Sequence, residues 1–467
     1  MIGKSHRVND GTRRGQAGRV LIPMALLLLS VATSRGQVTY SGGSGTREDP
    51  YLISTVRDLL ALAANTNDWS SHFRLIADID MAGVPQDTVC MIGDATIPFR
   101  GSFDGAGRKI LHFTCICPDR NRVGLFGHIR AIGGGVRDLC LIDPNVEGAT
   151  GVSVGALVGH LGTGTVTGCR VEGGHVSGAM AVGGLVGWNY ATIEECTAQA
   201  EVHGQYSVGG LVGLCGSDAQ VRHCSADAQV TGIGRVGGLA GVCTVTVLQW
   251  SSAKGYAAGS SYVGGLVGCS EGATIMNCYS ATSVKGDSIV GGLVGYNGPS
   301  CNCSEGRLPG VILNCYSTGR VTGGAEAGGL VGLDEPDGVV DGSFWNTETS
   351  GMTTSTGGTG LSTARLQTQS MFVHAGWNFS QETGTADTWT IRREPQYPVF
   401  AWQVLAGDFD GDADIDLADL SALAACWRQG STPFATGGAD MTGDRQIDAR
   451  DLQILCGNWL MGIKRGR

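Results

Sequence analysis

The sequence has 467 residues, a formal net charge of −10 at pH 7, and charged side chains at only 16% of its positions. Such an acidic, lightly charged chain lacks the basic patch that nucleic acid or an anionic membrane surface requires. We therefore expect no nucleic-acid partner.

Residues 1–36 have the three-part plan of a secretory signal peptide. Basic residues from Lys4 to Arg19 precede an apolar run, Val20 to Ala32, and Ser34-Arg35-Gly36 supplies small residues for cleavage. The run of 13 residues is short for a membrane span, and a membrane anchor is the alternative. We expect a secreted protein, extracellular or on the cell surface, without a transmembrane segment after cleavage and with a mature net charge of about −15.

Residues 37–100 are expected to form an N-terminal cap on the repeats that follow, because a stack of repeats exposes an unpaired edge at each end. Thr55-Val-Arg-Asp58 matches a capping box with Asp in place of Glu, and it predicts a short amphipathic helix that ends at Ala64. The apolar side of this helix carries Val56, Leu59, Leu60 and Ala63. A strand is predicted where polar residues alternate with Phe73, Leu75, Ala77 and Ile79.

One unit repeats within residues 101–350. The phrase Val-Gly-Gly-Leu-Val-Gly begins at Val182, Val208, Val263 and Val290, and it returns with one change at Val154, Val236 and Ala327. Its leucines are 26 to 28 residues apart, except for a last gap of 37 that indicates an insertion. Units of this size cannot bury their apolar side alone and must stack on their neighbours.

The second half of each unit has the pattern of a strand. From Cys196 to Val202, small or apolar residues alternate with polar ones, a period of two that excludes a helix. The same step follows Cys224, Cys278 and Cys315. From Cys169 to Val176 it is one residue longer and contains Gly173-Gly174, which indicates a bulge. We predict a mainly β fold: a parallel β-solenoid, or β-helix, with coils of about 27 residues, two or three strands per coil, and a spacing of about 4.8 Å.

The phrase Gly-Gly-Leu-Val-Gly, followed by an Ile-x-x-Cys or Val-x-x-Cys step and a closing Val-x-Gly, resembles the GLUG repeat of secreted bacterial surface proteins. The lead-in Gly-Gly-Ser-Gly-Thr-x-x-Asp-Pro-Tyr, which ends at Tyr51, resembles the segment found before such repeats. The resemblance implies an adhesive or surface-associated protein and no reaction of its own.

Cysteines recur at one position of the repeat, and Trp250 is expected to replace them in the coil that has none. The row consists of Cys169, Cys196, Cys224, Cys278 and Cys315, with Leu139 before it. Stacked thiols about 4.8 Å apart with parallel Cβ vectors are too distant for a disulfide, so we expect buried free thiols even in an oxidising compartment. Cys301 and Cys303, in the insertion, are better candidates for a loop bridge or for a reactive thiol. A structural zinc site is not expected, because Cys-x-x-Cys pairs are absent from the sequence.

Residues 351–402 are expected to form a C-terminal cap or linker. A chain poor in aromatic residues concentrates them here, at Trp377, Phe379, Trp389, Tyr397 and Trp402. Large rings cover a solenoid end well, which favours a packed cap. An exposed aromatic platform for sugar rings is the alternative.

Residues 403–467 contain two calcium-loop patterns and predict a small α-helical domain that binds two Ca²⁺ ions. Oxygen ligands fall at loop positions 1, 3, 5, 7, 9 and 12, as Ca²⁺ prefers. The first loop offers Asp408, Asp410, Asp412, Asp414, Asp416 and Asp419, and the second offers Asp440, Thr442, Asp444, Gln446, Asp448 and Asp451. Ile415 and Ile447 stand at position 8, and helices are expected from Leu417 to Trp427 and from Ala449 to Trp459.

The two loops resemble a type I dockerin over residues 405–462, and the resemblance implies docking onto a cohesin-like partner. Two departures leave details open. Ala413 and Arg445 replace the glycine at position 6, where positive φ costs a residue with a Cβ about 1 kcal/mol, so occupancy of both loops is open. Leu417-Ala418 and Ala449-Arg450 replace the small hydroxyl residues that usually recognise cohesin.

The sequence favours a non-enzymatic repeat protein for adhesion or extracellular assembly, attached through the calcium module, with a polysaccharide or cell-surface ligand. The alternative is an extracellular glycoside hydrolase or lyase of a cellulosome-like system. We predict no catalytic residues, because acids such as Glu194, Glu201 and Asp227 do not share rungs with supporting Lys or Arg. A protease or esterase is not favoured, since His-Glu-x-x-His is absent and the Gly-x-Ser-x-Gly match at Ser153 lies inside a repeat.

Overall fold

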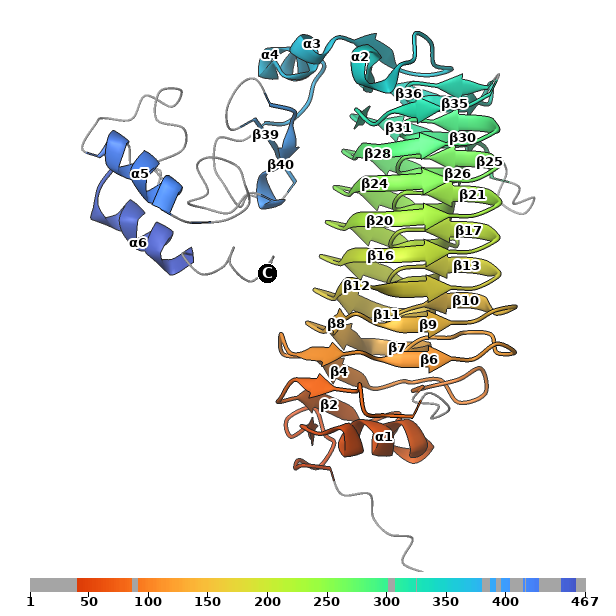
Figure 1. Cartoon of the computed structure of the whole chain (residues 1–467), viewed down its shortest axis with the longest axis vertical. Helices are drawn as coiled ribbons and strands as arrows, with labels where there is room; N and C mark the ends of the chain where they lie inside the picture. The colour runs from red at the N-terminus through yellow and green to blue at the C-terminus, as the bar shows by residue number, and fades with distance from the viewer. Residues whose placement is uncertain are drawn as a thin grey trace, which may run out of the picture. The chain divides into compact units, whose positions relative to one another are not determined.

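The computed structural model describes residues 40–85, 91–300, 307–324, 326–379, 387–391, 396–403, 415, 417–427 and 447–458. It confirms the predicted parallel β-solenoid, which makes about nine turns (Figure 1). The signal peptide predicted at residues 1–36 lies outside the described residues. Within the described ranges, the helices are too short or too polar to cross a membrane.

The solenoid is built from three parallel sheets, here called sheets 1, 2 and 3. Sheet 1 has 17 strands: β1 (Tyr51–Ile53), β2 (His72–Leu75), β4 (Ser102–Asp104), β7 (Phe126–Arg137), β11 (Val158–Thr167), β14 (Val186–Asn189), β15 (Thr192–Glu194), β18 (Val212–Cys215), β19 (Gln220–Arg222), β22 (Ala240–Thr244), β23 (Val247–Gln249), β26 (Val267–Glu271), β27 (Thr274–Met276), β30 (Val294–Gly298), β31 (Val311–Leu313), β35 (Val331–Asp334) and β36 (Val339–Asp341). Sheet 2 has seven: β10 (Val152–Gly155), β13 (Met180–Gly183), β17 (Tyr206–Gly209), β21 (Gly234–Gly237), β25 (Ser261–Gly264), β29 (Ser288–Gly291) and β34 (Ala327–Gly328). Sheet 3 has 14: β3 (Ile79–Asp80), β5 (Lys109–Leu111), β6 (Thr114–Ile116), β8 (Cys140–Ile142), β9 (Asn145–Glu147), β12 (Arg170–Ser177), β16 (Thr197–His203), β20 (Ser225–Thr231), β24 (Ser252–Ala258), β28 (Tyr279–Lys285), β32 (Tyr316–Ser317), β33 (Val321–Thr322), β37 (Phe344–Asn346) and β38 (Thr359–Leu361).

A complete coil contains four short strands rather than the predicted two or three. The coil formed by β13, β14, β15 and β16 shows why, since two residues are enough to turn each corner. At the corner before β16, Glu195 adopts a left-handed backbone with φ of 54°, and Trp250 and Asn277 do the same in later coils. Corners this short, made by residues other than glycine, leave no loop signal in the sequence.

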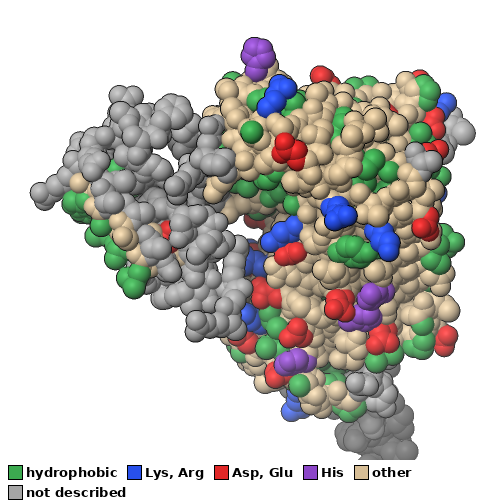
Figure 2. Space-filling model, turned by 45° about the horizontal axis from the view of Figure 1, so that its top comes forward, with side chains coloured by type: hydrophobic (Ala, Val, Ile, Leu, Met, Phe, Trp, Pro, Cys, Tyr) green, Lys and Arg blue, Asp and Glu red, His purple; other side chains and the backbone are tan. Residues whose placement is uncertain are grey.

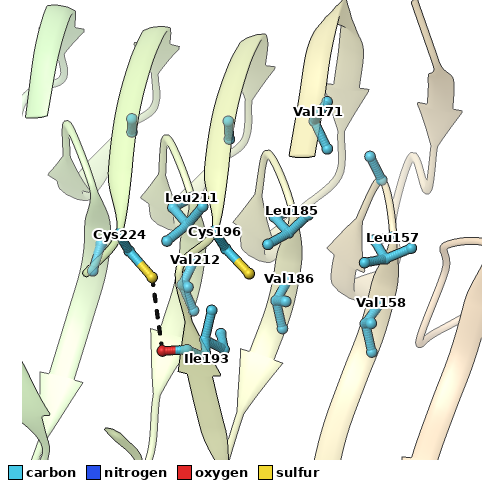
Figure 3. Close-up of a cluster of buried hydrophobic side chains, with 14 of the residues drawn as sticks. Leu157, Val158, Val171, Leu185, Val186, Ile193, Cys196, Leu211, Val212 and Cys224 are labelled. Atoms are coloured by element: carbon cyan, nitrogen blue, oxygen red, sulfur yellow. Dashed lines mark hydrogen bonds between the residues drawn. The ribbon is translucent and has the colours of Figure 1, made fainter. Parts of the chain in front are cut away.

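The repeated phrase pairs with itself in register from coil to coil. Val182 lies opposite Val208, and Val236 lies opposite Val263. Figure 3 shows the leucines that follow, Leu157, Leu185 and Leu211, stacked beside Val158, Val186 and Val212. All seven leucines of the phrase are fully buried. Sequence identity between repeats therefore reflects packing of the core.

The second glycine of the phrase is required by the close approach of successive coils. A Cβ on Gly184 would lie 2.2 Å from the carbonyl oxygen of Gly210, and one on Gly210 would lie 2.1 Å from that of Gly238. Real Cβ atoms do not approach oxygen this closely, so a side chain at Gly184 or Gly210 would force the two coils apart; the first copy of the phrase has Ala156 at this position.

The cysteine row is confirmed with one correction. Cys169, Cys196, Cys224, Cys278 and Cys315 are buried free thiols, and burial raises the pKa of Cys196 well above its usual value. In the coil without a cysteine, Ser251 occupies the position of the cysteine row. Its hydroxyl accepts the Cys224 N–H at 3.2 Å, and its carbonyl accepts the Tyr279 N–H. The assignment of Trp250 was wrong by one residue: its side chain contacts Trp389 and Phe400 instead. The predicted bridge at Cys301 and Cys303 lies outside the described residues.

The aromatic residues beyond the repeats form the predicted packed cluster, but they cover the outer face of sheet 3. This segment contains α2 (Thr347–Ser350), α3 (Thr363–Leu366), α4 (Gln369–His374), the antiparallel pair β39 (Trp389–Thr390) and β40 (Val399–Phe400), and the 3-10 turn η2 (Ala401–Gln403). Trp389 and Phe400 are fully buried. They pack with Tyr279 and Tyr316, whose rings stack 5.1 Å apart on neighbouring coils. Trp377 and Trp389 are buried in this packing and cannot form an open sugar platform, whereas Phe379, Tyr397 and Trp402 are partly buried.

The N-terminal helix α1 (Val56–Ala64) confirms the predicted capping box. The Asp58 N–H donates to the Thr55 hydroxyl, and the Asp58 carboxylate accepts the Thr55 N–H. Leu59 and Leu62 are its fully buried apolar residues. The strand predicted from Phe73 to Ile79 is two strands, β2 and β3, because the chain turns from sheet 1 into sheet 3 between them.

We expect Thr55→Ala to destabilise the start of α1 by about 1 kcal/mol, the usual contribution of a side-chain N-cap. Amides of Val56–Ala64 should then exchange hydrogen faster, by about fivefold if opening is local. Hydrogen-exchange mass spectrometry measures this directly. Thr66→Ala, an exposed threonine just beyond the helix, is the matched control and should leave exchange unchanged.

Candidate metal centre

Two helices follow the predicted calcium loops and share a small core. They are α5 (Leu417–Cys426) and α6 (Ala449–Asn458), which confirms the predicted helices over these ranges. The core consists of Ile415, Leu423, Ile447 and Leu455, each at most 1% exposed. Ile415 and Leu423 lie 32 residues before Ile447 and Leu455, so the two halves contribute equivalent side chains.

The last predicted ligand of each loop lies in the first turn of its helix. Asp419 and Asp451 are both fully buried. The Asp451 carboxylate accepts the Asp448 N–H at 2.9 Å, and the Asp448 carboxylate accepts the Arg450 N–H at 2.8 Å. A buried carboxylate is costly unless hydrogen bonds or a cation compensate it, and hard oxygen donors of this kind suit Ca²⁺. The described part of the centre therefore fits a calcium ion.

The remaining predicted ligands lie outside the described residues. They are Asp408, Asp410, Asp412, Asp414, Asp416, Asp440, Thr442, Asp444 and Gln446. Ala413 and Arg445, at the usual glycine position, lie outside them as well.

Acidic residues on the solenoid do lie opposite basic ones on neighbouring coils. This corrects the sequence prediction that the acids lack Lys or Arg partners at equivalent positions. Glu194 lies opposite Arg222 in register, with Oε1 and Nε 3.2 Å apart. Asp227 lies opposite Lys254, with Oδ2 and Nζ 3.1 Å apart. Acidic and basic side chains are interspersed on the face shown in Figure 2. Solvent-accessible pairs of this kind, half-buried at Glu194 and Arg222, contribute at most about 1 kcal/mol and indicate pairing between neighbouring coils rather than a reaction centre.

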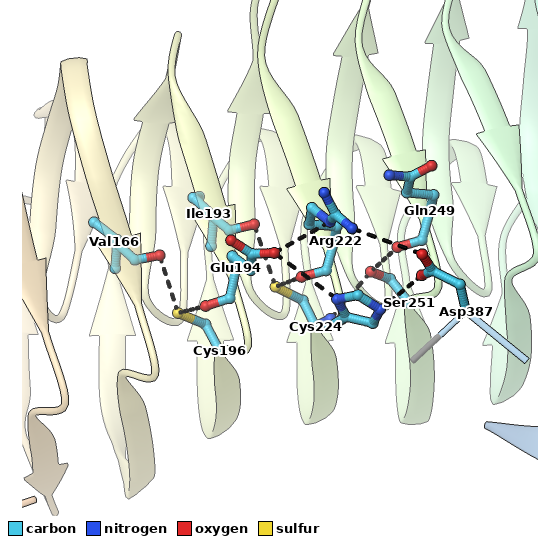
Figure 4. A network of polar contacts seen from close by, with 10 residues as sticks. Val166, Ile193, Glu194, Cys196, Arg222, Cys224, Gln249, Ser251 and Asp387 are labelled. Atoms are coloured by element: carbon cyan, nitrogen blue, oxygen red, sulfur yellow. Dashed lines mark hydrogen bonds and ion pairs between the residues drawn. The ribbon is translucent and has the colours of Figure 1, made fainter. Parts of the chain in front are cut away.

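Arg222 also takes part in a polar network that holds the segment around Asp387 against the solenoid. Figure 4 shows Arg222 between Glu194 and Asp387. The His223 ring, 9% exposed, has Nε2 3.0 Å from Asp387 Oδ1, and it meets Trp402 edge-on. The network joins two parts of the chain that are more than 160 residues apart.

A row of rings crosses neighbouring coils on sheet 1. His128 lies opposite His160, and His160 lies opposite Trp188. Their ring centroids are 4.9 and 5.8 Å apart, and Tyr190 stacks on Trp188. Sequence reasoning missed this row because unequal coil lengths hide the alignment, and only the register reveals it.

Burial lowers the pKa of His160 to about 4, helped by the nearby charges of His128, Arg122 and Arg130. The unfolded chain binds this proton below about pH 6.5, whereas the folded chain does not until about pH 4. Stability should therefore fall progressively as the pH drops from about 6.5 to 4. Thermal melts over this range in metal-free buffer should show a shallower pH dependence for His160→Gln. The exposed His374→Gln should follow the parent protein, and an unchanged slope in His160→Gln would contradict the assignment.

Comparison with known proteins agrees with both parts of the chain. The type I dockerin domain model matches residues 406–457, and the GLUG motif model matches residues 178–202 and 259–285. The chain is therefore a β-solenoid protein with GLUG motifs and a type I dockerin domain. Type I dockerin domains bind calcium.

Similar proteins come from an archaeon and a bacterium. Halomucin of Haloquadratum walsbyi is 33% identical over 190 residues, which is 38% of this chain and 2% of halomucin. A protein of Evansella cellulosilytica, provisionally named a Gly-rich membrane protein, is 36% identical over 149 residues, 30% of this chain and 17% of that one. The chain thus spans less than a fifth of the length of these relatives. A solved structure from Bacteroides ovatus, provisionally named an immunoglobulin A1 protease, is 18% identical with a TM-score of 0.43, and covers 78% of this chain and 96% of its own.

Proposed function

We propose that this protein is a secreted or cell-surface, non-enzymatic repeat protein that serves adhesion or extracellular assembly. It attaches to a cohesin-like partner through residues 405–462 in a calcium-dependent way. The observation that carries the proposal is the type I dockerin match at residues 406–457, on the same chain as the solenoid. A docking module on a long repetitive body suits presentation of that body at a fixed location.

The outer positions of the solenoid support presentation rather than a reaction. At one outward position of the equivalent strands β16, β20 and β24, the three successive coils carry Glu201, Gln229 and Tyr256. The next position along these strands points inward and carries Val202, Val230 and Ala257, which are fully buried. Outward chemistry thus changes with each coil while the interior is kept. Such a surface offers an extended and varied face to a polysaccharide or cell-surface ligand.

For the calcium centre, we propose the twelve ligands named above, from Asp408 to Asp419 and from Asp440 to Asp451. A bound Ca²⁺ supplies the positive charge that holds each loop against its helix. Asp451 orders the end of its loop by accepting the Asp448 N–H. Ile415 and Ile447 anchor both loops in the shared core.

The surface beside this core suits a protein partner. Leu417, at the start of α5, is 72% exposed. A hollow of about 410 Å³ is lined by Leu420, Leu423, Ala424, Trp427 and Leu452. An exposed leucine next to an apolar hollow with a tryptophan is typical of an interface anchor.

Titration calorimetry against a panel of type I cohesin domains tests the proposal. We expect binding of the mature chain in 2 mM Ca²⁺ or a similar excess, about 100-fold or more weaker binding in chelator, and weak binding by Asp419→Ala at intermediate calcium. Asp287→Ala, an exposed acid on the solenoid, is the control and should bind like the parent chain. Calcium-independent binding would contradict the dockerin role. Release of reducing sugar or unsaturated product from a polysaccharide panel would instead identify the alternative, a hydrolase or lyase.

A further inference from the structure

A mixed group of imidazoles and a carboxylate lies on the outer face of sheet 3. His175 on β12 lies opposite Glu201 on β16, and His203 lies two positions further along β16. One ligand atom from each of the three side chains lies within 4.8 Å of the others. Within the residues that the structure describes, no other three or more His, Cys, Asp or Glu side chains come together in this way.

The bulge in β12 is what brings His175 to this face. Register shifts between Glu172 and His175, where Gly173 and Gly174 have φ of 75° and 83°. If Gly173 and Gly174 instead continued a regular strand, the alternation that begins at the buried Val171 would turn His175 into the core. The two glycines are also needed for space, because a Cβ on Gly174 would lie 2.2 Å from the Pro144 carbonyl oxygen.

The environment of His203 is that of a metal-ligating histidine. Its Nδ1 is hydrogen-bonded to the hydroxyl of Thr231 on the next coil, and when Nδ1–H is the donor, Nε2 keeps its lone pair for a metal. Histidine ligands in metal sites commonly donate their second ring N–H to such a partner. The two imidazole rings lie 5.1 Å apart.

A hollow of about 620 Å³ adjoins the group. Its lining includes His175 and Glu201 together with Asp143, Asp227 and Gln199. Additional ligands, whether water or a group from another molecule, have room here. Gly173 and Gly174 also line the hollow, and their lack of side chains leaves it wider at the bulge.

We propose that His175, Glu201 and His203 bind a divalent transition-metal ion of the zinc class, with an open coordination position that faces this hollow. Two imidazole nitrogens and one carboxylate oxygen favour Zn²⁺ and its neighbours over Ca²⁺ or Mg²⁺, which prefer oxygen ligands alone. Metal–ligand distances near 2.1 Å place ligand atoms about 3.4 Å apart in a tetrahedron, so the three side chains, whose ligand atoms lie within 4.8 Å of one another, must close in on the ion. This site differs in place and in donor chemistry from the calcium loops, and it does not depend on the proposed function.

The test uses the full mature chain without an affinity tag and saturated with calcium, with accessible thiols such as Cys456 blocked by alkylation. The parent chain is titrated with Zn²⁺ by calorimetry and with Co²⁺ by visible absorbance. It should bind one more ion than His203→Asn does in the same titrations. Glu201→Gln alters an exposed side chain, so the chain should fold normally while Zn²⁺ affinity falls at least tenfold. Thr231→Val should weaken Zn²⁺ binding by about 10- to 100-fold, because it removes the hydrogen bond between the Thr231 hydroxyl and Nδ1 of His203.

The pair of His128 and His160 is the matched control. It also places two imidazoles on neighbouring coils, at 4.9 Å, but belongs to no three-ligand group among the described side chains. His160→Gln should therefore keep the Zn²⁺ stoichiometry of the parent chain. Equal Zn²⁺ binding by the parent chain, His203→Asn and Glu201→Gln would overturn the proposal, as would loss of the ion in His160→Gln alone.

Discussion

Gly210→Ala is expected to disrupt the solenoid around its coil, at a cost of about 3 kcal/mol. The new Cβ would lie 2.1 Å from the Gly238 carbonyl oxygen and near the Ala228 side chain. Backbone on both sides is fixed by strands in register, so the clash cannot be relieved by moving a flexible side chain. The coils must separate, and each coil is stabilised chiefly by its immediate neighbours.

Hydrogen-exchange mass spectrometry and thermal melting measure this effect. Amides of β17, β18, β21 and β22 should lose protection, and the main melting transition should broaden or fall. Gly83→Ala is the control, because a Cβ there meets no atom within 4 Å. If Gly210→Ala melted like Gly83→Ala, close coil approach would not be the reason for the glycine pair.

Calcium removal should destabilise residues 405–462 and leave the main transition of the solenoid unchanged. A ligand that binds only the folded state adds about 4 kcal/mol when its concentration is 1,000 times its dissociation constant. The small core of Ile415, Leu423, Ile447 and Leu455 cannot supply comparable stability alone. Calorimetric scans with calcium and with chelator should therefore differ in the minor transition.

Asp419→Ala should reproduce part of the chelator effect in the presence of calcium, since it removes a fully buried carboxylate at the proposed ligand position. Asp287→Ala should leave both transitions in place. A large calcium-dependent shift of the main transition would show that the solenoid depends on the calcium module.

The sequence predicted the solenoid because its strongest signals are local. The period of the phrase, the alternation after Cys196 and the extra residue before Val176 all survive in the structure, at β16 and at the bulge of β12. Capping of α1 was predictable for the same reason, since Thr55 and Asp58 are three residues apart.

Features that depend on register were not predictable. Even coils without an insertion differ by one or two residues in length, so Glu194 reaches Arg222 after 28 residues while Asp227 reaches Lys254 after 27. A fixed period therefore misplaces side chains, as it did at Trp250 and Ser251. The group of His175, Glu201 and His203 was missed because its alignment depends on the bulge. The calcium helices were predictable because both loops follow the same internal spacing.

The in-register pairing of one phrase with its own copies has a consequence for folding. Val182 meets Val208 through the same contacts with which Val208 meets Val236, so the phrase alone cannot tell one partner from the next. A growing stack could skip a whole unit and still match leucine with leucine. The bulge at Gly173-Gly174 interrupts this degeneracy, because the register of β12 against β16 shifts there, whereas β16 against β20 and β20 against β24 show no such shift. Irregularities of this kind therefore distinguish one coil from another when the stack forms.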